Sequence, residues 1–425
     1  MTTLNPHAPH LAFADPSLAD GRGHHFALTL QLTHGAQARG IPVTWLVHRD
    51  FNAEPPDGVT VHKVFSATMY DRYRAETKGC LPPDLHRRLL AELDDGVAAA
   101  GLSARDHVYF HTGFGDVFRA LQLHAQRDQA SEGPFVHVCT PYDHDTMPGK
   151  DPGPAVLEAL RSFRALASVD RKLFFWAETP QLARHYTATY GFNMRPMPLP
   201  APWMSKSSAA PDATRPVTVL YLGAAREEKG FLHLPTLAER LYESLGRSGR
   251  LRFVVQCSPQ IIGYLPAIRQ AIERLQALPS SYVRLIPDVL GEEEYRSNLL
   301  ECDIVALLYD RKNYRIRGSG VAVEAVAADK CLLTFAGTFC ASLVTEGGGC
   351  VVEHLDEAVD QLAGMVERMG EYRARAEVQG RKYRLVNDVG AYAARILARS
   401  EPRNRSPFFP STLVGRIGAP MLAAP

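Results

Sequence analysis

YRIRGSGVAVEAVAA, which runs from Tyr314 to Ala328, is the most informative part of this 425-residue chain. A loop of small residues, Gly318 to Gly320, leads into an apolar helix that carries one carboxylate, Glu324. The first backbone N–H groups of a helix have no intrahelical partner, and together with the helix dipole they favour a phosphate. The stretch therefore predicts a glycine loop and a helix start that can bind an anion.

A second anion-binding feature lies about ninety residues earlier in the chain. The apolar run VTVLYLG, Val217 to Gly223, predicts a buried strand, and AAREEKG follows it. Arg226 and Lys229 are thereby expected just beyond the carboxyl end of a strand, where α/β domains bind ligands. Two cations and an open helix start within one domain are what a bound diphosphate needs.

The whole chain alternates apolar runs with helical patterns, such as Glu292 to Glu301 and Leu355 to Met369, which is typical of parallel sheets covered by helices. Its length exceeds what one hydrophobic core usually supports, so we expect two domains. Six prolines between Arg195 and Pro216 prevent a continuous helix or central strand there. The predicted units are a first Rossmann-like domain, a linker, a second Rossmann-like domain, a helix that crosses back to the first domain and an irregular tail, at 1–202, 203–215, 216–384, 385–400 and 401–425.

Composition argues against several classes of protein. The 47 basic and 46 acidic residues nearly cancel, so no net charge favours nucleic acid. The seven cysteines contain no CxxC pair, which argues against a zinc knuckle or a disulfide framework. No signal peptide and no apolar run of about 18 residues is apparent. We therefore expect a cytoplasmic protein with reduced thiols, capable of peripheral contact with the inner face of a membrane.

The second half of the chain resembles the donor domain of GT-B glycosyltransferases, in particular the retaining enzymes of glycosyltransferase family 4. The likeness covers VLYLGAAREEKG and the region up to CLLTF, about Val217 to Phe335. The opening DPSLADGRGHH is similar to the start of the acceptor domain of such enzymes. The resemblance implies an α/β, GT-B architecture, in which two Rossmann-like doubly wound domains face each other across a cleft.

The resemblance also implies an activity and the residues that carry it. A hexose would pass from a nucleotide-diphosphate sugar to a hydroxyl of a glycan or lipid-linked glycan, with retention, without metal and without a further cofactor. Arg226 and Lys229 would neutralise the diphosphate, and Glu324 would hold the ribose hydroxyls. The backbone amides from Ser319 to Val321 would meet the diphosphate or the sugar.

One position departs from the pattern of the family. Eight residues before the ribose-binding glutamate the family has a second glutamate that contacts the donor sugar, whereas this chain has Ile316, with Arg317 beside it. Related proteins carry the variant that appears here as Tyr314, Arg317, Ser319 and Gly320. Either the sugar is held differently, with Arg317 or Tyr314 near the pocket, or the motif reports only the fold.

The first half offers polar and flexible residues at predicted strand ends. Gly21 and Gly23 lie in ADGRGHH, and we expect them to line the cleft near the acceptor or the diphosphate. His111 follows the strand HVYF, while Asp143 and His144 follow FVHVCT. Loops at strand ends carry the chemistry of such domains, so these three are candidate catalytic residues, although a histidine there is often just polar surface.

The triplet DHD, Asp143 to Asp145, raises a specific alternative. Two carboxylates can share one hard divalent cation, as the DxD motif of the other glycosyltransferase fold does. The diphosphate-binding features of the second half argue against this interpretation, and we expect no metal site.

Two other functions fit the same pair of domains. A nucleotide-sugar epimerase would bind the same diphosphate but add acid and base carboxylates around the sugar. A non-catalytic scaffold or regulatory protein would keep the fold after losing a donor contact, and Ile316 keeps this alternative open.

Overall fold

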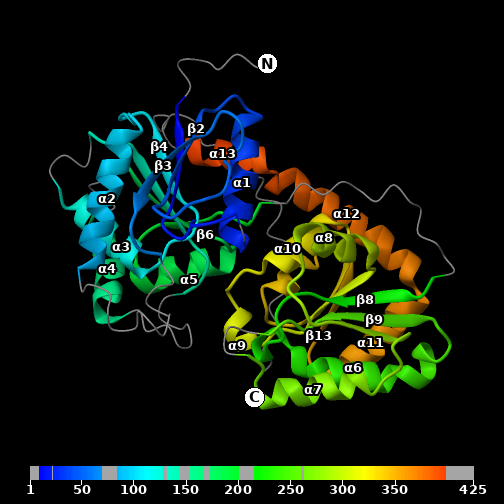
Figure 1. Cartoon of the computed structure of the whole chain (residues 1–425). Helices are drawn as coiled ribbons and strands as arrows, with labels where there is room; N and C mark the ends of the chain where they lie inside the picture. The colour runs from blue at the N-terminus through cyan, green and yellow to red at the C-terminus, as the bar shows by residue number, and fades with distance from the viewer. Residues whose placement is uncertain are drawn as a thin grey trace, which may run out of the picture.

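A computed structural model of the chain contains two α/β domains, each built on a parallel sheet with helices on its faces (Figure 1). The residues that it describes are 9–21, 23–68, 84–127, 132–143, 153–166, 172–200, 215–259 and 263–398. The predicted tail at 401–425, and the predicted linker except for Arg215, lie outside these ranges.

The first domain has a parallel sheet whose described strands run in the order β3-β2-β1-β4-β5-β6-β7. These strands are β1 (Leu11–Asp15), β2 (Val43–His48), β3 (Thr60–Phe65), β4 (His107–Phe110), β5 (Phe135–Thr140), β6 (Leu173–Ala177) and β7 (Met194–Pro196). The helices between them are α1 (Gly23–Gln37), α2 (Leu85–Ala99), α3 (Gly115–Ala125), α4 (Gly153–Leu166) and α5 (Pro180–Tyr190). The strand order reverses between β1 and β4, and the carboxyl ends of two such strands border a ligand-binding crevice.

The second domain repeats this plan, with its described strands in the order β10-β9-β8-β11-β12-β13. The strands are β8 (Val217–Tyr221), β9 (Leu251–Gln256), β10 (Val283–Ile286), β11 (Ile304–Leu307), β12 (Cys331–Phe335) and β13 (Gly349–Val352). The α-helices are α6 (Leu234–Leu241), α7 (Pro266–Gln276), α8 (Glu292–Glu301), α9 (Arg311–Tyr314), α10 (Gly320–Ala327), α11 (Leu355–Glu367), α12 (Met369–Asn387) and α13 (Val389–Leu397). Here the order reverses between β8 and β11, which confirms a doubly wound architecture in both halves.

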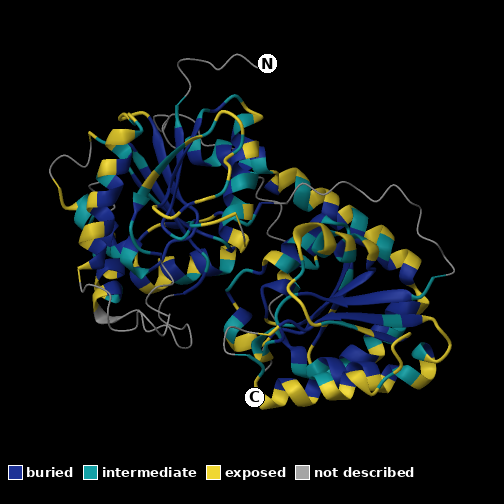
Figure 2. Cartoon of the chain, in the orientation of Figure 1, coloured by how far each residue is buried: buried dark blue, intermediate teal, exposed yellow. Residues whose placement is uncertain are grey.

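The central strands are buried on both faces, which explains their uninterrupted apolar sequences. Every residue of β1, β8 and β12 is buried. Figure 2 shows both sheets as buried layers, while the helices expose their outer faces. Each sheet therefore has a hydrophobic core on either side.

The C-terminal helices connect the second domain back to the first. In Figure 1 α12 runs along the second domain, and α13 lies against the first domain beside α1. The helix predicted over 385–400 is instead divided, because Asp388 is extended and its side chain caps α13 by accepting from the Ala391 N–H. A buried hydrogen bond of 2.5 Å links the hydroxyl oxygens of Tyr392 on α13 and Tyr109 on β4.

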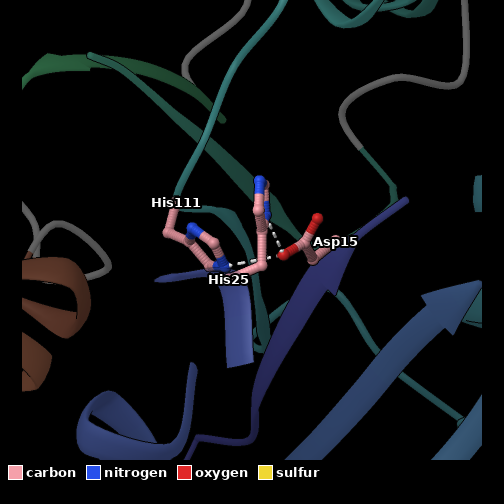
Figure 3. Close-up of side chains that lie close together, drawn as sticks. All are labelled: Asp15, His25 and His111. Atoms are coloured by element: carbon pink, nitrogen blue, oxygen red, sulfur yellow. Dashed lines mark hydrogen bonds and ion pairs between the residues drawn. The ribbon is translucent and has the colours of Figure 1, made fainter. Parts of the chain in front are cut away.

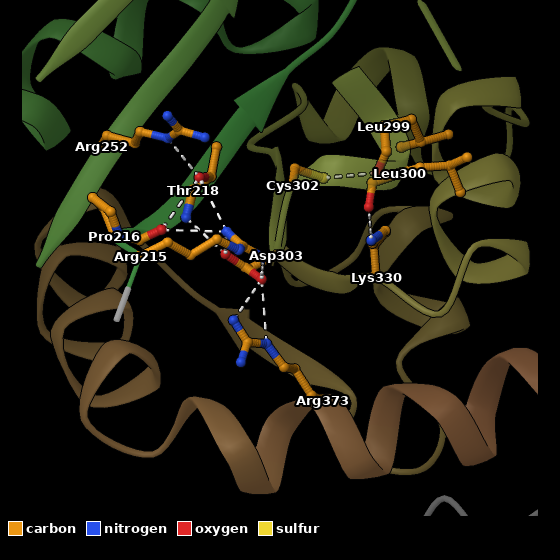
Figure 4. A network of polar contacts seen from close by, with 10 residues as sticks. All are labelled: Arg215, Pro216, Thr218, Arg252, Leu299, Leu300, Cys302, Asp303, Lys330 and Arg373. Carbon is orange, nitrogen blue, oxygen red and sulfur yellow. Dashed lines mark hydrogen bonds and ion pairs between the residues drawn. The ribbon is translucent and has the colours of Figure 1, made fainter. Parts of the chain in front are cut away.

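A buried carboxylate holds together the two segments by which the domains are connected (Figure 4). Asp303, at the start of β11, accepts hydrogen bonds from both terminal nitrogens of Arg215, at 2.7 and 2.8 Å. Arg373 on α12 donates to the same carboxylate at 2.7 Å, and the Thr218 N–H donates at 2.9 Å. Asp303 thereby fixes the end of the linker and α12 to the amino end of the second sheet.

Within the part of the chain that the structure describes, no helix is long and apolar enough to cross a membrane.

Candidate functional site

The glycine loop of the second domain is docked against the first domain. Thr179, which follows β6, donates a hydrogen bond from Oγ1 to the Ile316 carbonyl at 2.6 Å. The Ile316 side chain is buried in the hydrophobic cluster of the first domain, whereas the chain on either side of it belongs to the second domain. The departure of this position from the family pattern is thus explained by packing, because the Ile316 side chain fills space in the core of the first domain.

The helix start predicted to bind a phosphate is present and open. Ser319 caps α10, its hydroxyl accepting from the Ala322 N–H at 3.3 Å. Gly320, the first residue of the helix, is exposed, and Val321 is half-buried. Gly318 comes directly before the cap and faces Glu178 of the first domain.

Arg226 and Lys229 lie in a short 3-10 turn after β8, as the sequence predicts. The Lys229 Nζ is 3.0 Å from the place that a Cβ on Gly223 would take, so the ammonium lies against the strand end. Gly230, at φ +74°, allows this turn, since a Cβ there would lie 1.9 Å from the Leu308 carbonyl oxygen. Gly230 thus permits the turn that carries Lys229, and the missing side chain of Gly223 leaves room for its ammonium group.

Positive charge accumulates around Lys229. Burial first, and then the charges of Arg226 and Arg317, lower the pKa of Lys229 to about 8. Arg226 also pairs with Glu228 at 3.2 Å, which offsets part of this charge. Arg317, whose guanidinium lies 5.3 Å from the centre of the Tyr314 ring, belongs to the same cluster. Three cations brought this close together favour an anion between them.

Glu324 lies one turn inside α10 and faces the same space. Burial raises the pKa of Glu324, while Tyr295 and the charge of Lys229 act in the opposite direction. The Tyr295 hydroxyl on α8 donates a short hydrogen bond to the Glu324 carboxylate. Tyr295 was not predicted from the sequence, because nothing local relates it to a residue 29 positions away.

On the first domain the predicted His111 belongs to a buried triad (Figure 3). The Asp15 Oδ2, at the end of β1, lies 2.6 Å from the His25 Nδ1 and 3.0 Å from the His111 Nε2. Thr29 and Thr112 contact the two ring nitrogens of His111, at 3.0 and 2.7 Å. His111 is therefore placed at a strand end, as predicted, but its ring is fully engaged by neighbours.

The triad concentrates charge at the carboxyl ends of β1 and β4. Although burial alone would raise it, His25 and His111 hold the pKa of Asp15 well below its usual range. Among the described residues these three side chains form the group with metal-ligand character, their ligand atoms lying within 4.8 Å of one another. The contact between His25 and Asp15 at 2.6 Å also makes these three residues a hydrogen-bonded triad.

The remaining predicted residues of the first domain follow strands of the same sheet or lie outside the described residues. Gly21 is exposed in the loop between β1 and α1, and Gly23, also exposed, is the first residue of α1 with a φ of +71°. Asp143 is buried after β5 and pairs with the His185 Nε2 on α5 at 3.1 Å. His144, and with it two thirds of the DHD triplet, lies outside the described residues.

Comparisons with known proteins agree with this architecture. No family model and no curated protein matches the chain. A sucrose-phosphate synthase from Thermosynechococcus elongatus aligns over 91% of this chain and 97% of its own, with a TM-score of 0.63 and 12% identity. A trehalose-6-phosphate structure from E. coli bound with UDP-2-fluoro glucose aligns over 92% and 99%, with a TM-score of 0.63 and 13% identity.

A UDP-forming trehalose-phosphate synthase from Burkholderia xenovorans, in complex with glucose-6-phosphate, gives the same TM-score and identity over 92% of this chain and 100% of its own. Because such low identity bears only on architecture, these matches establish the fold. The predicted GT-B fold is confirmed, and membership of glycosyltransferase family 4 is not shown.

Proposed function

We propose that this protein transfers a hexose from a nucleotide-diphosphate sugar to a hydroxyl of a glycan or glycolipid acceptor, with retention and without a metal. The observation that carries the proposal is the convergence of Arg226, Lys229 and Arg317 beside the open start of α10. Such a cluster suits a diphosphate, and the carboxylate of Glu324 one turn further along suits the two hydroxyls of a ribose.

The same residues suit the chemistry of the departing group. When the bond between sugar and diphosphate breaks, negative charge builds on the leaving phosphate oxygen, and fixed cations and backbone N–H groups stabilise it. Lys229 and Arg226 would supply charge, while Gly320 and Val321 would supply N–H groups at the helix start. The acceptor would enter from the first domain, where the Asp15 triad, Gly21 and Asp143 line the strand ends.

The structures with a similar fold give this proposal a starting point for substrates. One of them carries UDP-2-fluoro glucose and another carries glucose-6-phosphate, so UDP-glucose and sugar phosphates belong among the first compounds to test. We further propose that the protein acts in the cytoplasm, with peripheral contact to the inner membrane face if its acceptor is lipid-linked.

A thermal-shift screen of the full-length protein against UDP-, GDP-, TDP- and ADP-sugars tests the proposal. We expect one nucleotide series to raise the melting temperature, and we expect EDTA to leave that increase unchanged. NMR of the reaction product should show a retained anomeric configuration. Altered sugar stereochemistry without an acceptor would identify an epimerase instead. The absence of any shift, together with no binding in calorimetry, would favour a non-catalytic scaffold.

A further inference from the structure

Glu178 is a carboxylate of the first domain that approaches the glycine loop of the second. It follows β6, and its backbone N–H donates to the Thr140 carbonyl at 3.1 Å, so its main chain is fixed by the sheet. The Glu178 Oε2 lies 3.0 Å from the place that a Cβ on Gly318 would take. The neighbouring Thr179 is hydrogen-bonded to Ile316, which holds the two segments in register.

The carboxylate of Glu178 has electrostatic neighbours but no hydrogen-bond donor among the described residues. Burial raises the pKa of Glu178 to about 7, although the charge of Arg317 partly opposes this rise. The other titratable groups coupled to it are Cys139 on β5, Tyr383 on α12 and Tyr392 on α13. Burial raises the pKa of each of these three groups, so they stay neutral at physiological pH.

The order of groups along α10 indicates what Glu178 would meet. Glu324 lies within the helix, Gly320 at its start and Gly318 two residues before it. A ligand with its ribose on Glu324 and its diphosphate at Gly320 would therefore extend its third part toward Gly318 and Glu178. A carboxylate repels a phosphate but accepts hydrogen bonds from hydroxyl groups, so that part of the ligand should be an uncharged, hydroxyl-rich ring.

We propose that Glu178 accepts hydrogen bonds from the sugar hydroxyls of the bound nucleotide sugar, and thus that the acceptor domain contributes a sugar-selecting residue to the donor site. The inference rests on the proposed function and assigns the part of the donor that each domain recognises. The second domain binds the nucleoside diphosphate, and Glu178 distinguishes the sugar ester from the free diphosphate. Glu178 is half-buried and accepts no hydrogen bond from a described residue, so sugar hydroxyls would supply the donors that its carboxylate lacks.

Calorimetry with full-length wild-type protein and the Glu178→Gln variant tests this assignment. The wild type is first measured with four free diphosphates, UDP, GDP, ADP and dTDP, and with the glucose ester of each. The diphosphate and ester that it binds most tightly are then used to compare the wild type with the variant. We expect Glu178→Gln to bind the free diphosphate within two-fold of wild type and the glucose ester about ten-fold more weakly. The control is Glu367→Gln, which removes an exposed carboxylate paired with Arg250 and should change neither affinity.

A pH series separates a sugar contact from a structural role. The terminal phosphate of the free diphosphate also ionises in this range, so wild type and Glu178→Gln are compared with each other at every pH. The ratio of their affinities for the glucose ester should grow between pH 6 and pH 8, as Glu178 ionises, whereas the ratio of their affinities for the free diphosphate should stay near one. Equal affinity of both proteins for the glucose ester, or an equal loss for both ligands, would overturn the inference and leave the proposed function standing. Failure of the wild type to bind any of the eight compounds would overturn both.

Discussion

Lys229 is the residue on which the proposed donor site depends most directly. Its pKa of about 8, lowered by burial and by two neighbouring arginines, means that the empty site loses this proton as the pH rises through 8. A bound diphosphate favours the charged ammonium and raises the pKa again. We therefore expect binding of a nucleoside diphosphate to take up a proton at pH 8.5 and to weaken above that pH. Calorimetry in buffers of different ionisation enthalpy measures the uptake, and binding without proton exchange would contradict it.

Replacing Lys229 by alanine should cost about 2–4 kcal/mol of transition-state stabilisation, by analogy with the loss of one oxyanion donor. The measurement is kcat/KM with the donor found in the screen. Lys382→Ala is the matched control, because Lys382 pairs with Glu346 on the surface. Unchanged turnover in Lys229→Ala would mean that Lys229 does not stabilise the departing diphosphate.

Ile316 packs into the core of the first domain, although the family has a sugar-binding glutamate at this position. Introducing the carboxylate by Ile316→Glu should destabilise the protein by about 3 kcal/mol or more, because the side chain is buried in the first domain's core. Ile316→Val, which only removes a methylene group, should cost about 1 kcal/mol. Urea unfolding measures both variants. If Ile316→Glu were as stable as wild type, the side chain would be free to reach the cleft.

Among the elements, α1 and α13 pack closely although they are far apart in the chain. A Cβ on Gly35 would lie 2.6 Å from the backbone of Val389. Gly35→Ala should therefore push α13 away and cost about 1–3 kcal/mol. Gly370→Ala in α12 is the control, since a Cβ there meets no atom within 4 Å and alanine favours a helix. Equal melting temperatures of the two variants would mean that α13 is not held tightly to α1.

Elements with a local sequence signal could be predicted closely. Helix α8 spans Glu292–Glu301 as expected, and α11 begins at the predicted Leu355. Apolar spacing decides such helices within a dozen residues. A helix was expected from Tyr372 to Asn387, and α12 does end at Asn387, whereas the helix predicted over 385–400 runs across the Asp388 cap that begins α13.

The site could be predicted only where one segment carries it. Lys229 and Glu324 could be proposed as site residues because a strand end and a glycine loop are local features. Asp15, Tyr295 and Glu178 were missed, since each acts through a partner that is distant in sequence or on the other domain. Their positions follow from the topology of the sheets, which single residues do not reveal.

For the whole molecule, the proposed reaction requires both domains to be held in a defined relation. The second domain carries the cluster of Arg226, Lys229 and Arg317, whereas Glu178 and the Asp15 triad belong to the first domain. Arg215 and Arg373, on the two connections between domains, both bind Asp303. The geometry of the cleft should therefore depend on a carboxylate that lies at the opposite end of the second sheet from the ligand.

Replacing Asp303 by asparagine tests this dependence. The change removes the charge that holds two partly exposed arginines, so we expect a loss of about 2–3 kcal/mol in the free energy of unfolding. Asp356→Asn, which breaks an exposed pair with Arg240, should cost less than about 0.5 kcal/mol. Asp303→Asn should also weaken binding of the nucleotide sugar, which needs both domains, more than binding of the free diphosphate, which needs only the second. If urea unfolding and both affinities matched those of Asp356→Asn, the relation of the domains would have to be set by the direct contact between Thr179 and Ile316 instead.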